Sequence, residues 1–146
     1  GIGSETTDNG DKQPDGPTTG DESNDSSGII SFVMIAVSDF PVGIDVEPTG
    51  RKINDYEKLT KRFYAEEEFP KIKCAFDFLA VWTKKESAVK YFGGNITENL
   101  SDIVFDRDTP KGRRELAGAS TFTFRLGDYV YSVTAKEKPS SPLLLL

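Results

Sequence analysis

Two carboxylates, Asp45 and Glu47, lie two residues apart within residues 42–47 (VGIDVE). This stretch reads as a buried strand, in which alternate residues share a face, so both carboxylates point the same way. Their Cα atoms are then expected roughly 6–7 Å apart. Pro48 has no N–H to donate and is expected to end the strand. Two carboxylates at a strand end suit a hard cation with oxygen ligands, although a solvated pair of acids is the open alternative.

A third carboxylate, Glu86, lies in a segment that reads as a long helix. Residues 73–92 contain neither Gly nor Pro and are rich in helix formers. Glu86 falls in the middle of an apolar stripe on this helix, formed by Ala75, Phe78, Leu79, Trp82 and Val89. A carboxylate on a buried face must be paired, hydrogen-bonded or metal-bound, because an isolated buried charge is costly.

Lys90 follows Glu86 by four residues, on the flank of the same stripe. One interpretation is an ordinary Glu86–Lys90 ion pair at a helix surface. The other combines the strand and the helix: Asp45, Glu47 and Glu86 form a divalent-metal site, and Lys90 lies beside it for anionic substrate oxygens. The residues alone leave both interpretations open.

Two motifs carry a resemblance to a known family. VGIDVE at 42–47 and WTKKESAVK at 82–90 resemble the two signature motifs of the 4′-phosphopantetheinyl transferase superfamily. RFYAEEE at 62–68 is similar to a weaker element that lies between them in that family. The order and spacing of the three agree with the family, and the resemblance runs from about residue 28 to about residue 135.

The resemblance implies a set of roles. Asp45, Glu47 and Glu86 match the family's Mg²⁺ ligands, which also hold the pyrophosphate of coenzyme A. Lys90 matches a lysine near the transferred phosphate, so Glu86 and Lys90 are the implied catalytic residues and Lys90 also contacts coenzyme A. The family moves the phosphopantetheine arm onto a serine of an acyl, peptidyl or aryl carrier protein. Lys85 keeps the motif's lysine but points about 100° away from Glu86, and no chemistry is assigned to it.

The chain also departs from the family. Its motifs are closer to the C-terminal lobe of the two-lobed, surfactin-synthetase-activating type, yet it contains no histidine. Residues 26–28 (SSG) match only the serine and glycine of the Ser-His-Ser element that ends the first lobe of that type. Two hypotheses follow. The first is a transferase that acts as a homo-oligomer or with a missing N-terminal lobe. The second is a non-catalytic lobe or fragment, either a pseudoenzyme or a carrier-protein-binding module, that lacks the half of the site that binds the nucleotide of coenzyme A.

The negative charge of the chain is concentrated at its start. The whole chain has 18 basic and 24 acidic residues, a net charge of −6 at pH 7. Residues 1–28 hold seven acids against one lysine and little apolar surface, so they are predicted to be an acidic disordered tail. An acidic tail on a neutral domain argues against nucleic-acid binding.

No segment predicts a membrane span, because the apolar run at 143–146 is too short to cross a bilayer. Residues 139–146 are predicted to be a C-terminal tail. The single cysteine, Cys74, is interpreted as a reduced thiol, since no signal peptide pattern is present. These features predict a cytoplasmic protein.

Residues 29–138 are predicted to fold as one α+β lobe, a small antiparallel sheet packed against one long helix. Residues 29–37 read as a strand that forms a hairpin with 42–47. A short helix is expected at 55–64, and Gly93 and Gly94 are expected to end the long one. Three more strands are expected, at 103–106, 121–125 and 129–135.

Two further groups of charged residues are weaker candidates. The basic run at 111–114 (KGRR) could meet a phosphate or an acidic helix of a carrier protein, but a solvated loop is the simpler interpretation. Asp106 and Asp108 are two residues apart, a spacing that metal ligands can have, but no motif in the sequence supplies further ligands for them.

Overall fold

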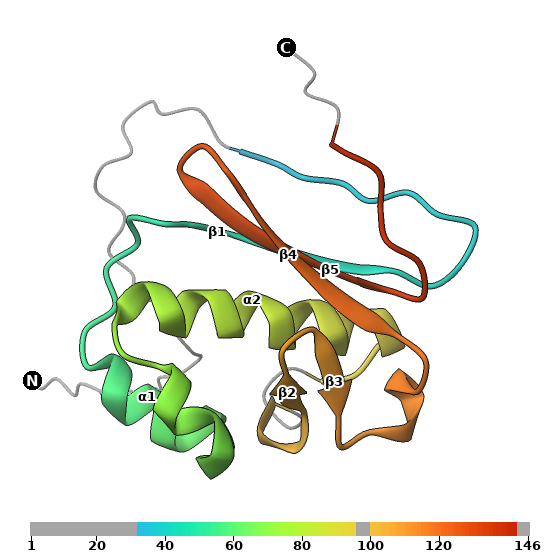
Figure 1. Ribbon diagram of the computed structural model, residues 1–146. Coiled ribbons are helices and arrows are strands. Elements are labelled where there is room, and N and C mark those ends of the chain that lie inside the picture. Colours follow the sequence, from blue (N-terminus) through green and yellow to red (C-terminus); the bar gives the residue numbers. More distant parts are fainter. Residues whose placement is uncertain (1–31, 96–99, 143–146) are drawn as a thin grey trace, which may run out of the picture.

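The computed structural model describes residues 32–95 and 100–142 (Figure 1). It confirms the α+β fold with a small antiparallel sheet and one long helix. The elements, in which η marks a 3₁₀ helix, are β1 (Gly43–Pro48), α1 (Tyr56–Phe63), η2 (Glu66–Lys71), α2 (Ala75–Phe92), η3 (Leu100–Asp102), β2 (Val104–Asp106), β3 (Thr109–Lys111), η4 (Arg114–Leu116), β4 (Ser120–Leu126) and β5 (Tyr129–Ala135).

The main sheet has three antiparallel strands in the order β1-β5-β4. The strands β4 and β5 are consecutive and turn at Gly127, which has a φ of 59° that favours glycine. Strand β1 pairs along the other edge of β5, with Asp45 opposite Ser132 and Glu47 opposite Val130. A separate small hairpin, β2-β3, turns at Arg107; the sequence predicted β2 but not β3.

The predicted strand at 29–37 is wrong over its described part. Residues 32–38 form no strand, and the partner of β1 is β5 rather than a hairpin neighbour. The ring of Phe32 instead stacks on Tyr129, with centroids 4.0 Å apart, so this segment packs against the sheet through side chains. Three of its apolar side chains are 74–91% exposed: Val33, Ile35 and Val37. A continuous apolar run therefore does not distinguish a paired strand from an extended segment that packs by alternate residues.

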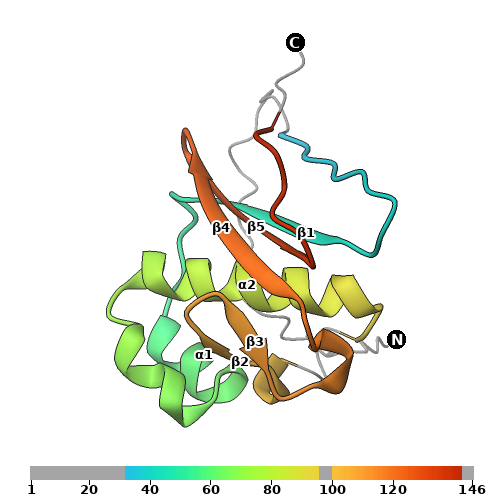
Figure 2. The same ribbon diagram turned by 45° about the vertical axis from the view of Figure 1, so that its right-hand side comes forward.

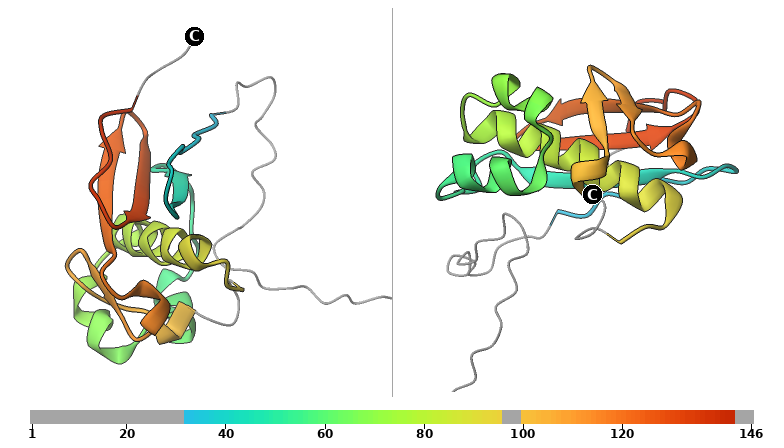
Figure 3. Two further views of the ribbon diagram at one scale, coloured as in Figure 1. Left: turned by 90° about the vertical axis from the view of Figure 1, so that its right-hand side faces the viewer. Right: turned by 90° about the horizontal axis from the view of Figure 1, so that it is seen from below.

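Helix α2 lies between two layers (Figures 1 and 2). Seen from the side, the sheet lies on one side of α2, and the layer of α1 and β2-β3 lies on the other (Figure 3). An aromatic cluster joins α2 to α1: Trp82 contacts Phe63 edge-on at 5.5 Å and stacks on Phe78 at 5.8 Å between ring centroids. Apolar burial on this side is the main source of stability for the lobe.

The contact between α2 and the sheet is made of small polar side chains. Thr83 Oγ1 lies 2.9 Å from Ser132 Oγ, and Ser87 Oγ lies 2.8 Å from Thr134 Oγ1. All four side chains are buried, so their hydroxyls must hydrogen-bond within the protein, and they satisfy one another. Because these side chains are short, the helix axis can lie close to the sheet.

The long helix begins two residues later than predicted and ends as predicted. Asp77 Oδ2 accepts a hydrogen bond from the backbone N–H of Lys73 at 2.9 Å, just before the first turn of α2. At the other end Gly93 has a φ of 74°, and its N–H bonds to the carbonyls of the last turn, which confirms the glycine stop. No helix within the described ranges is long and apolar enough to cross a membrane.

Most of the two predicted tails lies outside the described residues. Residues 1–31 and 143–146 are not described, and the segment SSG at 26–28 falls among them. The boundaries of the tails at residues 28 and 139 therefore stay predictions.

Candidate metal centre

A close contact between β1 and α2 brings the candidate carboxylates together. At Gly43, the first residue of β1, an added Cβ would lie 2.0 Å from Ser87 O and 2.5 Å from Tyr91 N. Backbone atoms cannot give way at such distances, so only glycine fits here. The absence of a side chain at Gly43 thus lets β1 lie against the turn of α2 that carries Glu86.

Carboxylate oxygens of Asp45, Glu47 and Glu86 lie within 4.8 Å of one another. Asp45 and Glu47 occupy same-face positions of β1 and are 7% and 9% exposed, and Glu86 reaches them from α2. The structure thus brings together the three carboxylates that the sequence suggested. The carboxylate of Glu86 points from α2 to Asp45 and Glu47 on the sheet.

Asp45 has a basic partner on only one of its two oxygens. Its Oδ1 accepts a hydrogen bond from Lys90 Nζ at 3.0 Å, and Lys90 also donates to Ile44 O at 3.4 Å. Lys90 therefore pairs across the site with β1 rather than along α2 with Glu86. Within the described part of the chain the buried Oδ2 of Asp45 accepts no hydrogen bond from an N–H or hydroxyl group, and a protonated Glu86 is the carboxyl that can donate to Asp45. An unpartnered buried carboxylate oxygen is costly, and a cation would relieve that cost.

Glu47 is paired with Arg51, four residues further along the chain. The chain turns after Pro48, where Thr49 N donates to Asp128 O at 2.7 Å and Arg51 N donates to Pro48 O at 3.1 Å. This turn returns the Arg51 side chain to β1, and its Nη1 donates to Glu47 Oε1. Arg51 is not among the residues predicted from the sequence. Its spacing of four residues from Glu47, across a turn with proline and glycine, is the signal that could have indicated it.

The pKa values of all three carboxyls are raised. Burial is the largest cause for Asp45 and Glu47, and it is opposed mainly by the charge of Lys90 at Asp45 and of Arg51 at Glu47. Burial, together with the neighbouring charge of Asp45, raises the pKa of Glu86 from 4.5 to about 8. The carboxyl of Glu86 is therefore largely protonated at neutral pH in the metal-free chain.

The donor set fits a divalent cation such as Mg²⁺. All three side chains offer oxygen, the ligand atom that Mg²⁺ prefers, and Mg²⁺ usually completes its shell with water and substrate phosphates. A positive charge at the centre would satisfy Asp45 Oδ2 and would lower the raised pKa values. The three carboxylates are therefore the residues that could hold such an ion.

Lys85, the residue before Glu86, contacts the opposite layer. It is fully buried, with Nζ 2.7 Å from Glu68 Oε1 and 2.9 Å from Leu100 O, and it also donates to Ile103 O. Glu68 in turn accepts a hydrogen bond from Phe105 N at 2.9 Å. These contacts join α2 to η2 and to the segment before β2, so Lys85 has a structural partner rather than a place in the carboxylate cluster.

The weaker candidates of the sequence lie at the surface. The basic run and the two aspartates take part in surface ion pairs, Lys111–Asp106 at 3.3 Å, Lys84–Asp108 at 3.6 Å and Arg113–Glu115 at 3.1 Å. Cys74 is a free, exposed cysteine at the N-cap of α2. None of these residues is part of the carboxylate cluster.

The fold and the site define an α+β domain in which a strand and a helix together present an acidic centre suited to a divalent metal. A family model, the 4′-phosphopantetheinyl transferase superfamily, matches residues 41–134. The chain therefore belongs to the 4′-phosphopantetheinyl transferase superfamily, which confirms the resemblance of its motifs. The matched region begins just before β1 and ends within β5, so it includes all three carboxylates and Lys90. No curated protein matches the chain.

Proposed function

We propose that this chain transfers the 4′-phosphopantetheine arm of coenzyme A to a serine of an acyl or peptidyl carrier protein, with Mg²⁺ as its cofactor. The observation that carries the proposal is the convergence of Asp45, Glu47 and Glu86 on one point inside the region that matches the superfamily. We also propose a cytoplasmic location, where both substrates, coenzyme A and the carrier protein, would be available to the chain.

In this proposal the carboxylates of Asp45, Glu47 and Glu86 hold the ion and fix its position relative to α2. Bound Mg²⁺ supplies positive charge to the pyrophosphate oxygens of coenzyme A. Asp45 offers its free Oδ2, and Glu86 gives up its proton to become a ligand. The close packing of β1 on α2 keeps these oxygens in place, which matters because positioning dominates catalysis of phosphoryl transfer.

Lys90 is the proposed second catalytic residue. Its side chain is 45% exposed and its ammonium lies beside Asp45, so it can reach an oxygen of a bound phosphate without leaving the site. The serine oxygen forms a new P–O bond, a P–O bond within the pyrophosphate breaks, and the nucleotide part leaves with the electron pair. Lys90 can stabilise the charge of that leaving group or help to move the serine proton.

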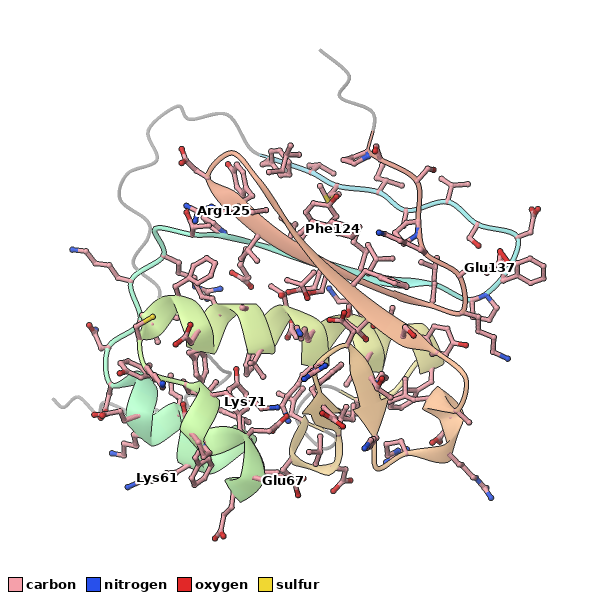
Figure 4. The ribbon with its side chains drawn as sticks, viewed as in Figure 1. Lys61, Glu67, Lys71, Phe124, Arg125 and Glu137 are labelled. Carbon is pink, nitrogen blue, oxygen red and sulfur yellow. The ribbon has the colours of Figure 1, made fainter. Side chains whose placement is uncertain are left out.

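Calorimetric titration of coenzyme A tests the cofactor site without a guess about the carrier. We expect binding in Mg²⁺ but not in EDTA, and loss of that binding in Glu86→Gln. Glu67→Gln is a matched control, because Glu67 is exposed and points away from the site (Figure 4). Transfer is then measured by the mass gain of a carrier protein. Full transfer by the Glu86→Gln variant would overturn the assignment.

The absence of histidine from the chain favours a second candidate, a non-catalytic lobe that binds a carrier protein. In this alternative the chain keeps the carboxylate cluster but lacks a complete binding site for the nucleotide of coenzyme A. Tight binding of a carrier that is never modified, with Mg²⁺ present and coenzyme A in excess, would support the alternative over the transferase.

A further inference from the structure

Arg51 places a second basic group at the carboxylate cluster, and the proposed function gives it no role. Its guanidinium donates to Glu47 Oε1, and the exposed fractions of the two side chains are 23% and 12%. The carboxylate oxygens of Glu47, Asp45 and Glu86 lie within 4.8 Å of one another, so the charge of Arg51 acts on the whole cluster and not only on Glu47.

The cluster becomes positively charged when a divalent cation is added. Three carboxylates face two basic groups, Lys90 on Asp45 and Arg51 on Glu47, which leaves one negative charge when all five side chains are ionised. Two further positive charges turn this into one positive charge. A cluster that carries no net positive charge when empty and one positive charge when loaded attracts a divalent cation first and an anion second.

We propose that Arg51 is the internal counter-ion of Glu47 in the metal-free site and a phosphate-binding residue once a divalent cation holds that carboxylate. The inference rests on the proposed metal site, and it names the residue that would couple the cation to its anionic ligand. The guanidinium of Arg51 would compete with the cation for Glu47 and would then bind the phosphate. Because linkage is reciprocal, bound cation would raise the affinity for phosphate and bound phosphate would raise the affinity for the cation.

Arginine suits this double role by its geometry. The guanidinium carries five N–H donors in a planar fork that matches carboxylate and phosphate oxygens alike. Within residues 32–95 and 100–142 it donates a single hydrogen bond, to Glu47, so other N–H groups remain for a phosphate. The side chain is also exposed enough to turn from Glu47 to a ligand in the solvent-facing part of the site.

Two titrations of the full chain test the inference. The first adds Mn²⁺ alone to metal-free protein, and the second adds inorganic pyrophosphate to Mg²⁺-saturated protein. Without its competing cation, Arg51→Met should bind Mn²⁺ about three- to fivefold more tightly. It should bind pyrophosphate about tenfold more weakly, since charge-assisted hydrogen bonds are lost. Arg51→Lys should keep the native Mn²⁺ affinity and show an intermediate pyrophosphate affinity.

The matched control is Arg62→Met, which removes the same charge from α1, where Arg62 lies over the Phe63 ring at 5.0 Å. It should leave both affinities unchanged. The opposite signs of the two effects distinguish this role from a structural one, because a damaged site would bind both ligands more weakly. Unchanged or weaker Mn²⁺ binding by Arg51→Met, or unchanged pyrophosphate binding, would overturn the inference.

The outcomes also separate the inference from the proposed function. A native chain that binds no Mn²⁺ would overturn both the metal site and the role of Arg51. A native Mn²⁺ site that Arg51→Met leaves unchanged would overturn only the inference. Both expected shifts in a chain that never modifies a carrier would support the inference and count against the transferase.

Discussion

Lys85 and Glu86 are consecutive residues of α2, yet they contact opposite layers of the molecule. The ammonium of Lys85 lies 2.7 Å from Glu68 Oε1 on the side of η2, and Glu86 points to Asp45 and Glu47 on the sheet. The buried ion pair on one side therefore fixes the rotation of the helix that presents the carboxylate on the other. A helix with partners on both sides has little freedom to turn.

Lys85→Met should destabilise the fold by about 3–5 kcal/mol, because it leaves the carboxylate of Glu68 buried without its counter-ion. The double variant Lys85→Met/Glu68→Gln should lose less than the sum of the two single losses, since it removes the unpaired charge. Urea unfolding monitored by the fluorescence of Trp82 measures both values.

Lys61→Met is the control for this pair, because Lys61 is exposed on α1 and points outward (Figure 4). Its free energy of unfolding should stay within about 0.5 kcal/mol of the native value. Equal losses for Lys61→Met and Lys85→Met would show that the buried pair contributes nothing.

The sequence predicted most of the acidic centre but not what supports it. Strand and helix periods place Asp45, Glu47 and Glu86 correctly on their own elements, because those periods are local properties of the chain. The partners Glu68 and Arg51 could not be predicted in this way. The first depends on how η2 packs against α2, and the second on how the turn after β1 folds back.

Gly43→Ala should weaken Mg²⁺ binding more than tenfold. The new Cβ would lie 2.0 Å from Ser87 O, so α2 must move away from β1 and carry Glu86 with it. A wider site should harm Ca²⁺ binding less than Mg²⁺ binding, because Ca²⁺ accepts longer bonds to oxygen. Calorimetry with each ion measures the ratio of the two affinities.

Gly50→Ala is the matched control for Gly43→Ala. Gly50 lies in the turn after β1, and a Cβ there would meet no atom within 4 Å. The variant should bind both ions as the native chain does. If Gly43→Ala also keeps the native Mg²⁺ affinity, then the close contact of β1 with α2 does not determine the geometry of the metal site.

The metal-free chain should lose stability as the pH rises from about 4.5 to about 8. The pKa of Glu86 is raised from 4.5 to about 8 in the fold, so across this window the folded chain binds more protons at Glu86 than the unfolded chain does. Glu86→Gln should remove this part of the slope. The measurement is Tm in EDTA across the window, compared between the two proteins.

Mg²⁺ should reverse the trend, because it requires the ionised form of Glu86. The gain in Tm from Mg²⁺ should therefore increase with pH up to about 8 in the native chain. Glu67→Gln, at an exposed position of η2, should follow the native curve. Parallel curves for the native chain and Glu86→Gln in EDTA would contradict the raised pKa.

The segment before β1 shows why one strand was predicted wrongly. Its apolar residues suit either a strand buried on both faces or an extended chain with one packed face, and composition alone does not separate the two. In the described residues β1 pairs with β5 along one edge only, and residues 32–38 pack against the face of the sheet instead of extending it along the other edge of β1. As a result, Ile35 and Val37 are exposed instead of paired.

We expect these exposed residues to cause self-association, which the sequence analysis anticipated as a homo-oligomer. Ile35 and Val37 are 78% and 91% exposed, and the nearby Val33 and Phe40 are 74% and 69% exposed. Apolar surface of this kind is stabilised by burial against another chain. Sedimentation should show dimers or larger species, and Ile35→Lys/Val37→Lys should be monomeric with native Mg²⁺ affinity. A native chain that stays monomeric at high concentration would contradict this expectation.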